Sequence, residues 1–319
     1  MTSGYGKKGY GKTGAAKSVW RMATTIPGHL AKRRASPDMT GAAQGTITLD
    51  PSDHITGAVT FAALRSDYTG RPGEPATLTV PVEAPVAIET NGIAYAVMMA
   101  TPLDLADFVT GFLMAEGLAQ ADEVGEVALH AAQDDDWGTG YVARVNLPPE
   151  RLGPILERAR RRVGDSSCGI CGIEGVEAAL RPLPRLARRS TATPQAIRRA
   201  LEDMREGQAL GRETRATHAA AFCDESGQVL ELREDVGRHN ALDKLVGALA
   251  RGGIDPAWGF IVMTSRCSYE LVEKTVRAGC PLLVTISAPT DLAVRRAHAA
   301  GLALCVVARD DSMLMLGPD

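Results

Sequence analysis

The spacing of apolar residues predicts strand pairs in the first half of the chain. Residues 86–90 and 93–98 are apolar runs joined by Asn91-Gly92, and an Asn-Gly pair between two such runs is the strongest short-range hairpin signal. Residues 123–147 repeat this arrangement around a polar turn at 134–140. We therefore expect two strand pairs in this part of the chain.

Two helices are expected beside these strands. Thr101 is a suitable N-cap and Pro102 a suitable first helical residue, so the first helix is predicted to begin there. Residues 148–162 predict the second helix. The segment that precedes the strands is polar and rich in Gly, Pro and Asp. We expect little regular structure before Thr77 for this reason.

In the C-terminal half, apolar runs of strand length alternate with segments of helical periodicity. A linker-like segment at 180–194 comes first, and Thr193 and Pro194 then cap a helix that runs to about Gly207. Strands that alternate with helices of about ten residues predict βαβ units and a mainly parallel sheet. The chain is therefore predicted to be α/β. The expected strands are 219–223, 228–233, 259–264, 282–287 and 302–308, and the expected helices are 240–251, 268–279 and 291–300.

The charge of the chain is unevenly distributed. The 319 residues carry a net charge of −3, but residues 1–37 contain eight Lys or Arg and no acidic residue. Without those eight positive charges, the rest of the chain carries −11. A basic segment rich in Gly and Ser is typical of a disordered arm, with contact to an acidic partner as the alternative.

Neither export nor membrane insertion is expected. Arg33-Arg34 is not followed by an apolar run, and no stretch is long and apolar enough to span a bilayer. Six cysteines, of which only two are closely spaced, do not resemble a disulfide scaffold. They favour a reducing cytoplasm in which the chain has buried thiols and one working pair.

Cys168 and Cys171 form that pair, in the glycine-rich sequence SSCGICGIEG at 166–175. Glycine after each cysteine favours a mobile loop. Arg158 and the arginines at 160–162 stand just upstream, and nearby guanidinium groups favour thiolate over thiol. A positively flanked cysteine pair on a loop is suited to sulfur chemistry.

Several other roles compete with sulfur chemistry for this pair. Structural zinc requires four ligands, usually as two close pairs, and a second CxxC is absent. Zinc deaminases require H-x-E before P-C-x-x-C, whereas His218 is followed by two alanines. A thioredoxin-like motif belongs at a strand-to-helix junction, and glycine-rich loops bury residues poorly. Dithiol redox chemistry stays open beside the main interpretation, a nucleophilic cysteine that accepts and delivers sulfur.

Three loops at the carboxyl ends of the predicted strands indicate where a ligand binds. They are residues 264–268, 287–290 and 308–312, and ligands of open α/β sheets bind at this edge. Two of the loops lead into helix N-termini, which favour phosphate. Arg266 and Arg309 are suited to gripping a diphosphate. The alternative for Ser268 and Thr290 is a simple helix cap.

A second cluster of polar and charged residues is the segment REDVGRHNALDK at 233–244. A charge run that enters a helix is usually a solvated, salt-bridged face. His239 has acidic residues on both sides and is a candidate for proton transfer, but a ligand-binding or interface role is favoured over it.

Taken together, these motifs resemble the formate dehydrogenase accessory sulfurtransferase family, FdhD. The resemblance covers about residues 77–313. It rests on these segments: EAPVAIETNG, ATPLDLADFVTGFLMAEG, the CGICG loop, HAAAF, EDVGRHNALDK, KTVRAGCPLL and SAPTDLAV. CGxCG followed by EDVGRHNALDK is very specific. The family usually has T-G-G-x-H where this chain reads TRATH at 214–218, and S-G-R-x-S where it reads TSRCS.

The resemblance implies a cytidine-deaminase-like mixed sheet flanked by helices, with a smaller N-terminal α+β part. The corresponding divisions are a basic arm at 1–75, an α+β subdomain at 76–165, the CGxCG loop and linker at 166–190, and a cofactor-binding domain at 191–319.

The resemblance also implies a homodimer that passes sulfur as a persulfide. The donor is a cysteine desulfurase, and the acceptor is the molybdenum bis(molybdopterin guanine dinucleotide) cofactor of formate dehydrogenase. Cys168 is the implied carrier and Cys171 assists it. With the strand-end argument, the expected cofactor-binding residues are Ser265, Arg266, Ser287, Thr290, His239, Val307, Ala308, Arg309, Asp310, Asp311 and Ser312. No metal is expected to bind directly, and no nucleic acid is expected as a partner. A non-catalytic cofactor chaperone is the alternative.

Overall fold

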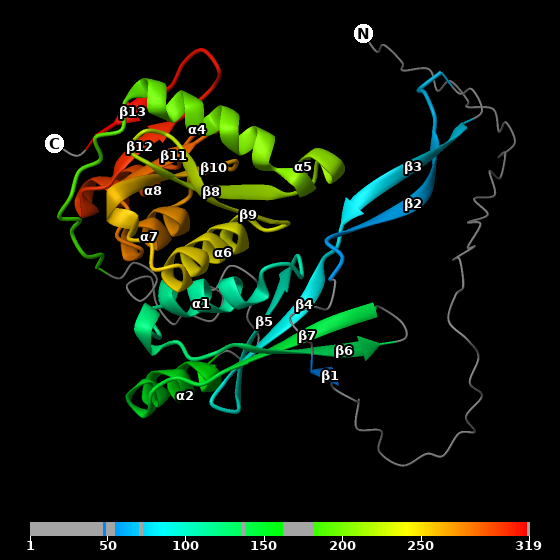
Figure 1. The fold of residues 1–319 in the computed structure, drawn as a ribbon, viewed down its shortest axis with the longest axis horizontal. Coiled ribbons are helices and arrows are strands. Elements are labelled where there is room, and N and C mark those ends of the chain that lie inside the picture. Colours follow the sequence, from blue (N-terminus) through cyan, green and yellow to red (C-terminus); the bar gives the residue numbers. More distant parts are fainter. Residues whose placement is uncertain (1–46, 49–54, 70–72, 135–137, 162–181, 318–319) are drawn as a thin grey trace, which may run out of the picture. The chain divides into compact units, whose positions relative to one another are not determined.

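In a computed structural model, the described residues form two large sheets, each packed in hydrophobic core, and a separate two-stranded sheet (Figure 1). The structure describes residues 47–48, 55–69, 73–134, 138–161 and 182–317. The chain divides into two compact units at Ala43, and all described residues belong to the second, Gln44–Asp319.

The C-terminal sheet has six strands in the order β13-β12-β11-β10-β8-β9. Strands β10, β11 and β12 are parallel to one another, whereas β8 runs antiparallel to β10, β9 to β8 and β13 to β12. The prediction of α/β architecture is confirmed, but the sheet is mixed rather than mainly parallel, because β8 and β9 form a hairpin. The strands are β8 His218–Asp224, β9 Val229–Asp235, β10 Gly259–Met263, β11 Leu282–Thr285, β12 Ala303–Val306 and β13 Leu314–Leu316.

Helices cover both faces of this sheet (Figure 1). Helix α4, Pro194–Gly207, packs through Ile197 and Met204 on one face. Helices α6 (Arg238–Arg251), α7 (Tyr269–Arg277) and α8 (Asp291–Ala300) pack on the other, where Leu245 and Leu271 join the core. Both faces are therefore buried, which explains the continuous apolar runs of the central strands.

The N-terminal sheet has the order β1-β6-β7-β4-β5, and helix α1, Leu105–Ala115, lies over it. Phe108 and Phe112 of α1 join Val86, Ile88 and Ala143 in its core. Both predicted strand pairs are confirmed. The bounds are β1 Ile47–Thr48, β4 Ala84–Thr90, β5 Ile93–Ala100, β6 Ala128–Asp134, β7 Gly138–Val145 and α2 Leu152–Arg161.

A close crossing of α1 and α6 joins the two sheets. A Cβ atom on Gly111 would overlap the carbonyl oxygen of Asp243, and one on Gly247 would overlap the carbonyl oxygen of Asp107. Only glycine allows the two backbones to approach this far. The helix that covers the first sheet is thereby packed directly on a helix that covers the second.

The expectation of little regular structure before Thr77 is wrong. Strand β2, Ala58–Arg65, pairs antiparallel with β3, Glu74–Pro81, in a two-stranded sheet of their own. Apolar cross-strand pairs such as Phe61 with Leu78 lie on one side of this hairpin, and Thr60 bonds Thr79 at 3.0 Å on the other. The alternation of side chains across the pair, rather than overall polarity, decides the structure of this segment.

Helix α1 begins later than predicted. It starts at Leu105 with Asp104 as the N-cap residue, so Thr101 is not its cap and Pro102 is not its first residue. Thr101 is instead bound by the C-terminal half: its N–H donates to Asp235 at 2.9 Å, and its hydroxyl accepts from the N–H of Val236 at 3.2 Å. Tertiary hydrogen bonds have replaced the local cap.

The cap predicted for α4 is confirmed, since the Thr193 hydroxyl accepts from the N–H of Ala196 at 3.2 Å. The linker-like break is also confirmed for residues 182–193, which lack helix and strand. Helix α5, Ala209–Thr214, and strand β13 were not expected. Among the described residues, no helix has both the length and the apolar character needed to cross a membrane.

Candidate functional site

The three predicted strand-end loops meet at one edge of the C-terminal sheet. The N–H of Cys267 donates to Ala288 at 3.3 Å, and the N–H of Thr290 donates back to Cys267 at 3.0 Å. The N–H of Val307 reaches Ser287 at 3.3 Å. Backbone hydrogen bonds thus join each loop to the next, and the predicted convergence is confirmed.

The third loop begins in a strained conformation. Val307 has a φ of 52°, which is an outlier for a β-branched residue and costs roughly 1–3 kcal/mol. The backbone turns sharply here, and the N–H of Arg309 then donates to Ser312 at 2.8 Å. Residues 309–312 are exposed while Ala308 is buried. Strain of this kind is concentrated at functional sites.

Several predicted ligand-binding side chains in these loops are exposed or already partnered. Arg266 and Arg309 are exposed. Asp310 forms an ion pair with Arg205 at 2.5 Å, and this hydrogen bond lowers the pKa of the Asp310 carboxyl. The Thr290 hydroxyl accepts from the N–H of Ala293 at 3.2 Å, so it is a helix cap. Ser265 is buried, and its hydroxyl donates to the carbonyl of Arg266.

Most of the polar segment 233–244 is structural. Asp235 and Lys244 are fully buried and lie 2.8 Å apart. The Lys244 ammonium also donates to the carbonyls of Thr101 at 2.9 Å and Glu234 at 3.1 Å. Asn240 donates to Asp235 at 2.9 Å and to Met99 at 2.8 Å. This buried cluster fixes the end of β5 to the start of α6.

Asp243 belongs to a second buried pair. Its carboxylate accepts from Lys274 of α7 at 2.6 and 2.8 Å. Burial raises the pKa of Asp243 to about 6, against the lowering effect of Lys274. The pair holds α6 against α7, which again is a structural role.

Arg238 and His239 are different, because they stand at the start of α6 and belong to neither of these buried pairs. His239 Nε2 lies 3.9 Å from Glu270 of α7, beyond hydrogen-bond range. Desolvation, followed by the charges of Arg238 and Lys274, lowers the pKa of His239 to about 4. His218, at the start of β8, also has a lowered pKa because of burial and Arg238. Both imidazoles are therefore neutral at pH 7.

Three polar atoms at this corner are buried and lack a hydrogen-bond partner in the described structure. They are Nε of Arg238, Nε2 of His239 and the hydroxyl of Ser268. Ser268 stands at the N-cap position of α7 but does not cap it. The cap role that fits Thr290 therefore does not apply to Ser268. Among the three, only His239 was predicted from the sequence to bind the ligand, whereas Arg238 and Ser268 were included only as members of the segments 233–244 and 264–268.

The cysteines divide into two groups. Cys223, Cys267, Cys280 and Cys305 are free and buried, and desolvation raises the pKa of each thiol to about 11 or 12. Cys168 and Cys171, the predicted working pair, lie outside the described residues.

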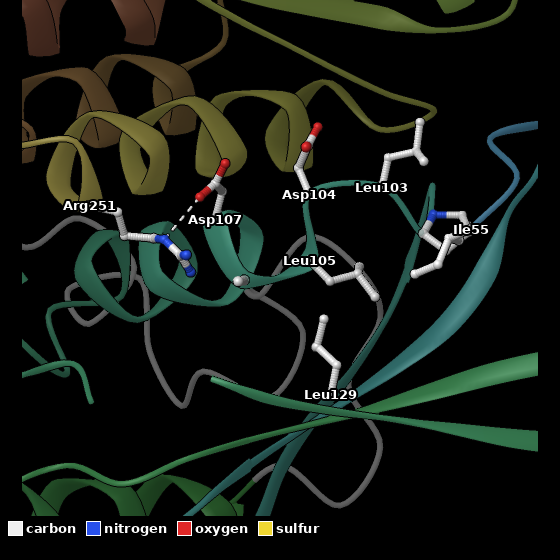
Figure 2. A pocket seen from close by; sticks show the side chains of 9 residues that line it. Ile55, Leu103, Asp104, Leu105, Asp107, Leu129 and Arg251 are labelled. Atoms are coloured by element: carbon white, nitrogen blue, oxygen red, sulfur yellow. Dashed lines mark ion pairs between the residues drawn. The ribbon is translucent and has the colours of Figure 1, made fainter. Parts of the chain in front are cut away.

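A cavity of about 400 Å³ lies elsewhere, at the N-terminus of α1 (Figure 2). Leu103, Leu105 and Leu129 give it an apolar side, and Asp107 is paired with Arg251 at 3.2 Å across its polar side. None of the predicted ligand-binding residues lines it. The cavity is therefore distinct from the predicted strand-end site.

Comparison with known proteins identifies the family. The model of the FdhD/NarQ family matches residues 81–317. The chain belongs to this family. A sulfur carrier protein FdhD from Xanthomonas campestris is 45% identical over 251 residues, which cover 78% of this chain and 88% of that protein. The sulfur carrier protein FdhD from Variovorax paradoxus is 43% identical over 236 residues, covering 74% of this chain and 84% of that protein.

A solved structure supports the FdhD fold. The crystal structure of a candidate formate dehydrogenase accessory protein from Desulfotalea psychrophila has a TM-score of 0.61, covers 82% of this chain and 97% of its own, and is 21% identical. At this identity the likeness concerns the fold alone. The predicted family and α/β class are confirmed, and the cytidine-deaminase-like description stays a prediction.

Proposed function

We propose that the protein carries sulfur as a persulfide on Cys168, from a cysteine desulfurase to the molybdenum bis(molybdopterin guanine dinucleotide) cofactor that formate dehydrogenase requires. The relatives of the FdhD/NarQ family that match this chain are named sulfur carrier proteins. The cofactor is the substrate that receives sulfur, and formate dehydrogenase apoprotein is the protein that it serves.

The state of the four described cysteines is the observation that carries this proposal. A sulfur carrier requires an accessible thiolate, because the thiolate is the nucleophile. Cys223, Cys267, Cys280 and Cys305 are buried and their pKa values are raised. They are structural thiols, which leaves the CxxC pair as the carrier.

Loading is a thiol–persulfide exchange. The Cys168 thiolate attacks the outer sulfur of the persulfide on the desulfurase and forms a new S–S bond. The S–S bond of the donor breaks, and its electron pair leaves with the desulfurase cysteine as a thiolate. The step involves no net oxidation or reduction.

Cys171 then releases the sulfur. Its thiolate attacks the Cys168 sulfur, forms a Cys168–Cys171 disulfide and expels hydrosulfide. Hydrosulfide replaces an oxygen ligand of molybdenum, which leaves as hydroxide. A thiol reductant returns the disulfide to two thiols, so the cycle requires the reducing cytoplasm expected from the cysteine content.

The strand-end edge is the proposed cofactor-binding surface. It offers the backbone amides and hydroxyl groups of three loops, and Val307 is strained at its centre. Ser265, Ser287 and His239 remain in the proposed site. We also propose a homodimer. Neither membrane insertion nor nucleic-acid binding plays a part in this function.

The test is a mass measurement on the intact chain. Incubation with a cysteine desulfurase and free cysteine is expected to add one sulfur atom, about 32 Da, to the wild-type chain and to Cys305→Ala. Cys168→Ala is expected to stay unloaded. Loading of Cys168→Ala to the wild-type level would rule out Cys168 as the carrier.

A cofactor chaperone without sulfur chemistry is the second candidate, favoured by the convergence of the three strand-end loops. It predicts that the double variant Cys168→Ala and Cys171→Ala still activates formate dehydrogenase in cells that lack the wild-type protein. Inactive dehydrogenase with normally folded variant would exclude it.

A further inference from the structure

Buried polar atoms without partners are rare in folded proteins, and this protein groups three of them. Native structures pair most buried side-chain donors and acceptors. An unpaired one costs about 1–3 kcal/mol. Nε of Arg238, Nε2 of His239 and Oγ of Ser268 are all buried and unpaired. Their grouping at one corner indicates a shared partner that comes from outside the described chain.

The corner is built from the starts of three elements, α6, α7 and β8. Arg238 and His239 open α6, Ser268 precedes α7, and His218 opens β8. Glu270 of α7 lies 3.9 Å from His239, which places the start of α7 beside the start of α6. The N–H of Thr264 in the first strand-end loop donates to Ala219 of β8 at 3.1 Å, and His218 pairs with Asp235 just before α6, so the three elements begin beside the strand-end loops.

A solvated, salt-bridged face does not account for these residues. Asp235 and Lys244 are bound to each other, and Asp243 to Lys274. Arg238 has no ion pair among those that the structure gives for the described residues. The carboxylates of Asp235 and Asp243 are thus already used, and the Arg238 charge is available to a ligand.

The chemistry of the three groups specifies an oxyanion. Arg238 Nε is a donor only and carries a positive charge, the Ser268 hydroxyl donates, and a neutral imidazole donates from one nitrogen. Guanidinium and hydroxyl groups are the common partners of phosphate oxygens. The N-termini of α6 and α7 add to the attraction for a negative charge.

We infer that Arg238, His239 and Ser268 bind a phosphate group. The inference rests on the proposed function, and it specifies which part of the cofactor this corner holds: the diphosphate of the nucleotide. It also replaces the earlier expectation for the diphosphate, since Arg266 and Arg309 are exposed whereas Arg238 Nε is buried.

A variant of Glu270 distinguishes an anionic ligand from a ligand that donates N–H groups. Its carboxylate is close to the corner and repels a phosphate, so Glu270→Gln is expected to tighten phosphate binding about two- to fivefold. A ligand that donated N–H groups to Glu270, such as a purine base or an amide, would be bound more weakly by this variant. The sign of the change therefore distinguishes the two kinds of ligand.

Calorimetric titration with inorganic pyrophosphate and with guanosine diphosphate tests the inference on the full chain. Arg238→Gln is expected to weaken binding of both roughly ten- to a hundredfold, and Ser268→Ala roughly threefold or more. Arg295→Gln, which removes an exposed arginine of α8, is the matched control and is expected to bind as the wild type does. Pyrophosphate binding as tight as guanosine diphosphate binding would identify a site for free anions, and much tighter guanosine diphosphate binding a nucleotide site.

Stability separates a binding role from a structural one. Arg238→Gln removes a charge that has no ion pair among the described residues and a buried Nε that has no acceptor, so the unliganded variant is expected to unfold at the same urea concentration as the wild type or a higher one. Absence of binding for both probes, or unchanged binding in Arg238→Gln, would overturn the inference. Sulfur loading on Cys168 is independent of this corner, so its failure would count against the proposed function alone.

Discussion

The buried Asp235–Lys244 pair gives the sharpest stability prediction. Both side chains are fully buried, 2.8 Å apart, and the Lys244 ammonium has two further carbonyl acceptors. Lys244→Met keeps the length of the side chain and removes its charge. The Asp235 carboxylate is then left in the interior without a counter-charge.

The expected loss of unfolding free energy is about 3–5 kcal/mol, the usual cost of removing one partner from a buried ion pair. Asp235 retains the N–H groups of Thr101 and Gly237 and the Asn240 amide, which places the value toward the lower end. Against a total stability of about 5–15 kcal/mol, this is a large fraction.

Urea denaturation monitored by circular dichroism measures the difference. Arg198→Met is the control, since the Arg198–Glu202 pair has side chains 68% and 51% exposed, and such pairs contribute only a few tenths of a kcal/mol. Asp235→Asn combined with Lys244→Met is expected to recover part of the loss. A loss below about 1 kcal/mol in Lys244→Met would refute the view that this pair fixes the two halves of the fold.

Three further predictions concern packing, pH and thiol reactivity. Gly111→Ala forces α1 away from α6 and is expected to cost about 3 kcal/mol or more in urea denaturation, whereas Gly153→Ala, with open space around it, is expected to leave stability unchanged or raise it. The pKa of His239 is about 4 in the folded protein against 6.5 when unfolded, so the unfolded chain binds more protons between these values. His239 therefore lowers wild-type stability as pH drops from 6.5 to 4, and stability is expected to fall less over this range in His239→Gln than in the wild type. Iodoacetamide at about pH 8, with peptide mapping as the readout, tests the buried thiols. No labelling is expected before denaturant is added at Cys223, Cys267, Cys280 and Cys305. Labelling of these four in the native protein would contradict their burial.

Short sequence motifs predicted the structure correctly where the residues that form the structure are neighbours in the sequence. The Asn91-Gly92 turn joins two strands of the N-terminal sheet because both residues adopt positive φ values, as that turn requires. Thr193 caps α4 with its own side chain. The family could also be predicted, since the cysteine loop and the segment 233–244 lie in order along the chain.

A short motif gave a wrong prediction where residues distant in the sequence form hydrogen bonds with it. Thr101 has the sequence of a helix cap, yet Asp235 and Lys244 bind its backbone, and the helix begins at Leu105. A cap contributes about 1 kcal/mol. Satisfying a buried ion pair is worth several times more, so the tertiary contact prevails.

The sequence by itself determined the α/β class, most strands and helices, and the family, because each is encoded in short-range pattern. Only the tertiary structure decided which polar residues are free to bind. Asp235, Asp243 and Lys244 form buried ion pairs. In contrast, Arg238, His239 and Ser268, from the starts of two helices, each have a buried polar atom without a hydrogen-bond partner among the described residues. Whether a charged side chain has a partner depends on residues far away in the chain, and spacing along the sequence does not contain that information.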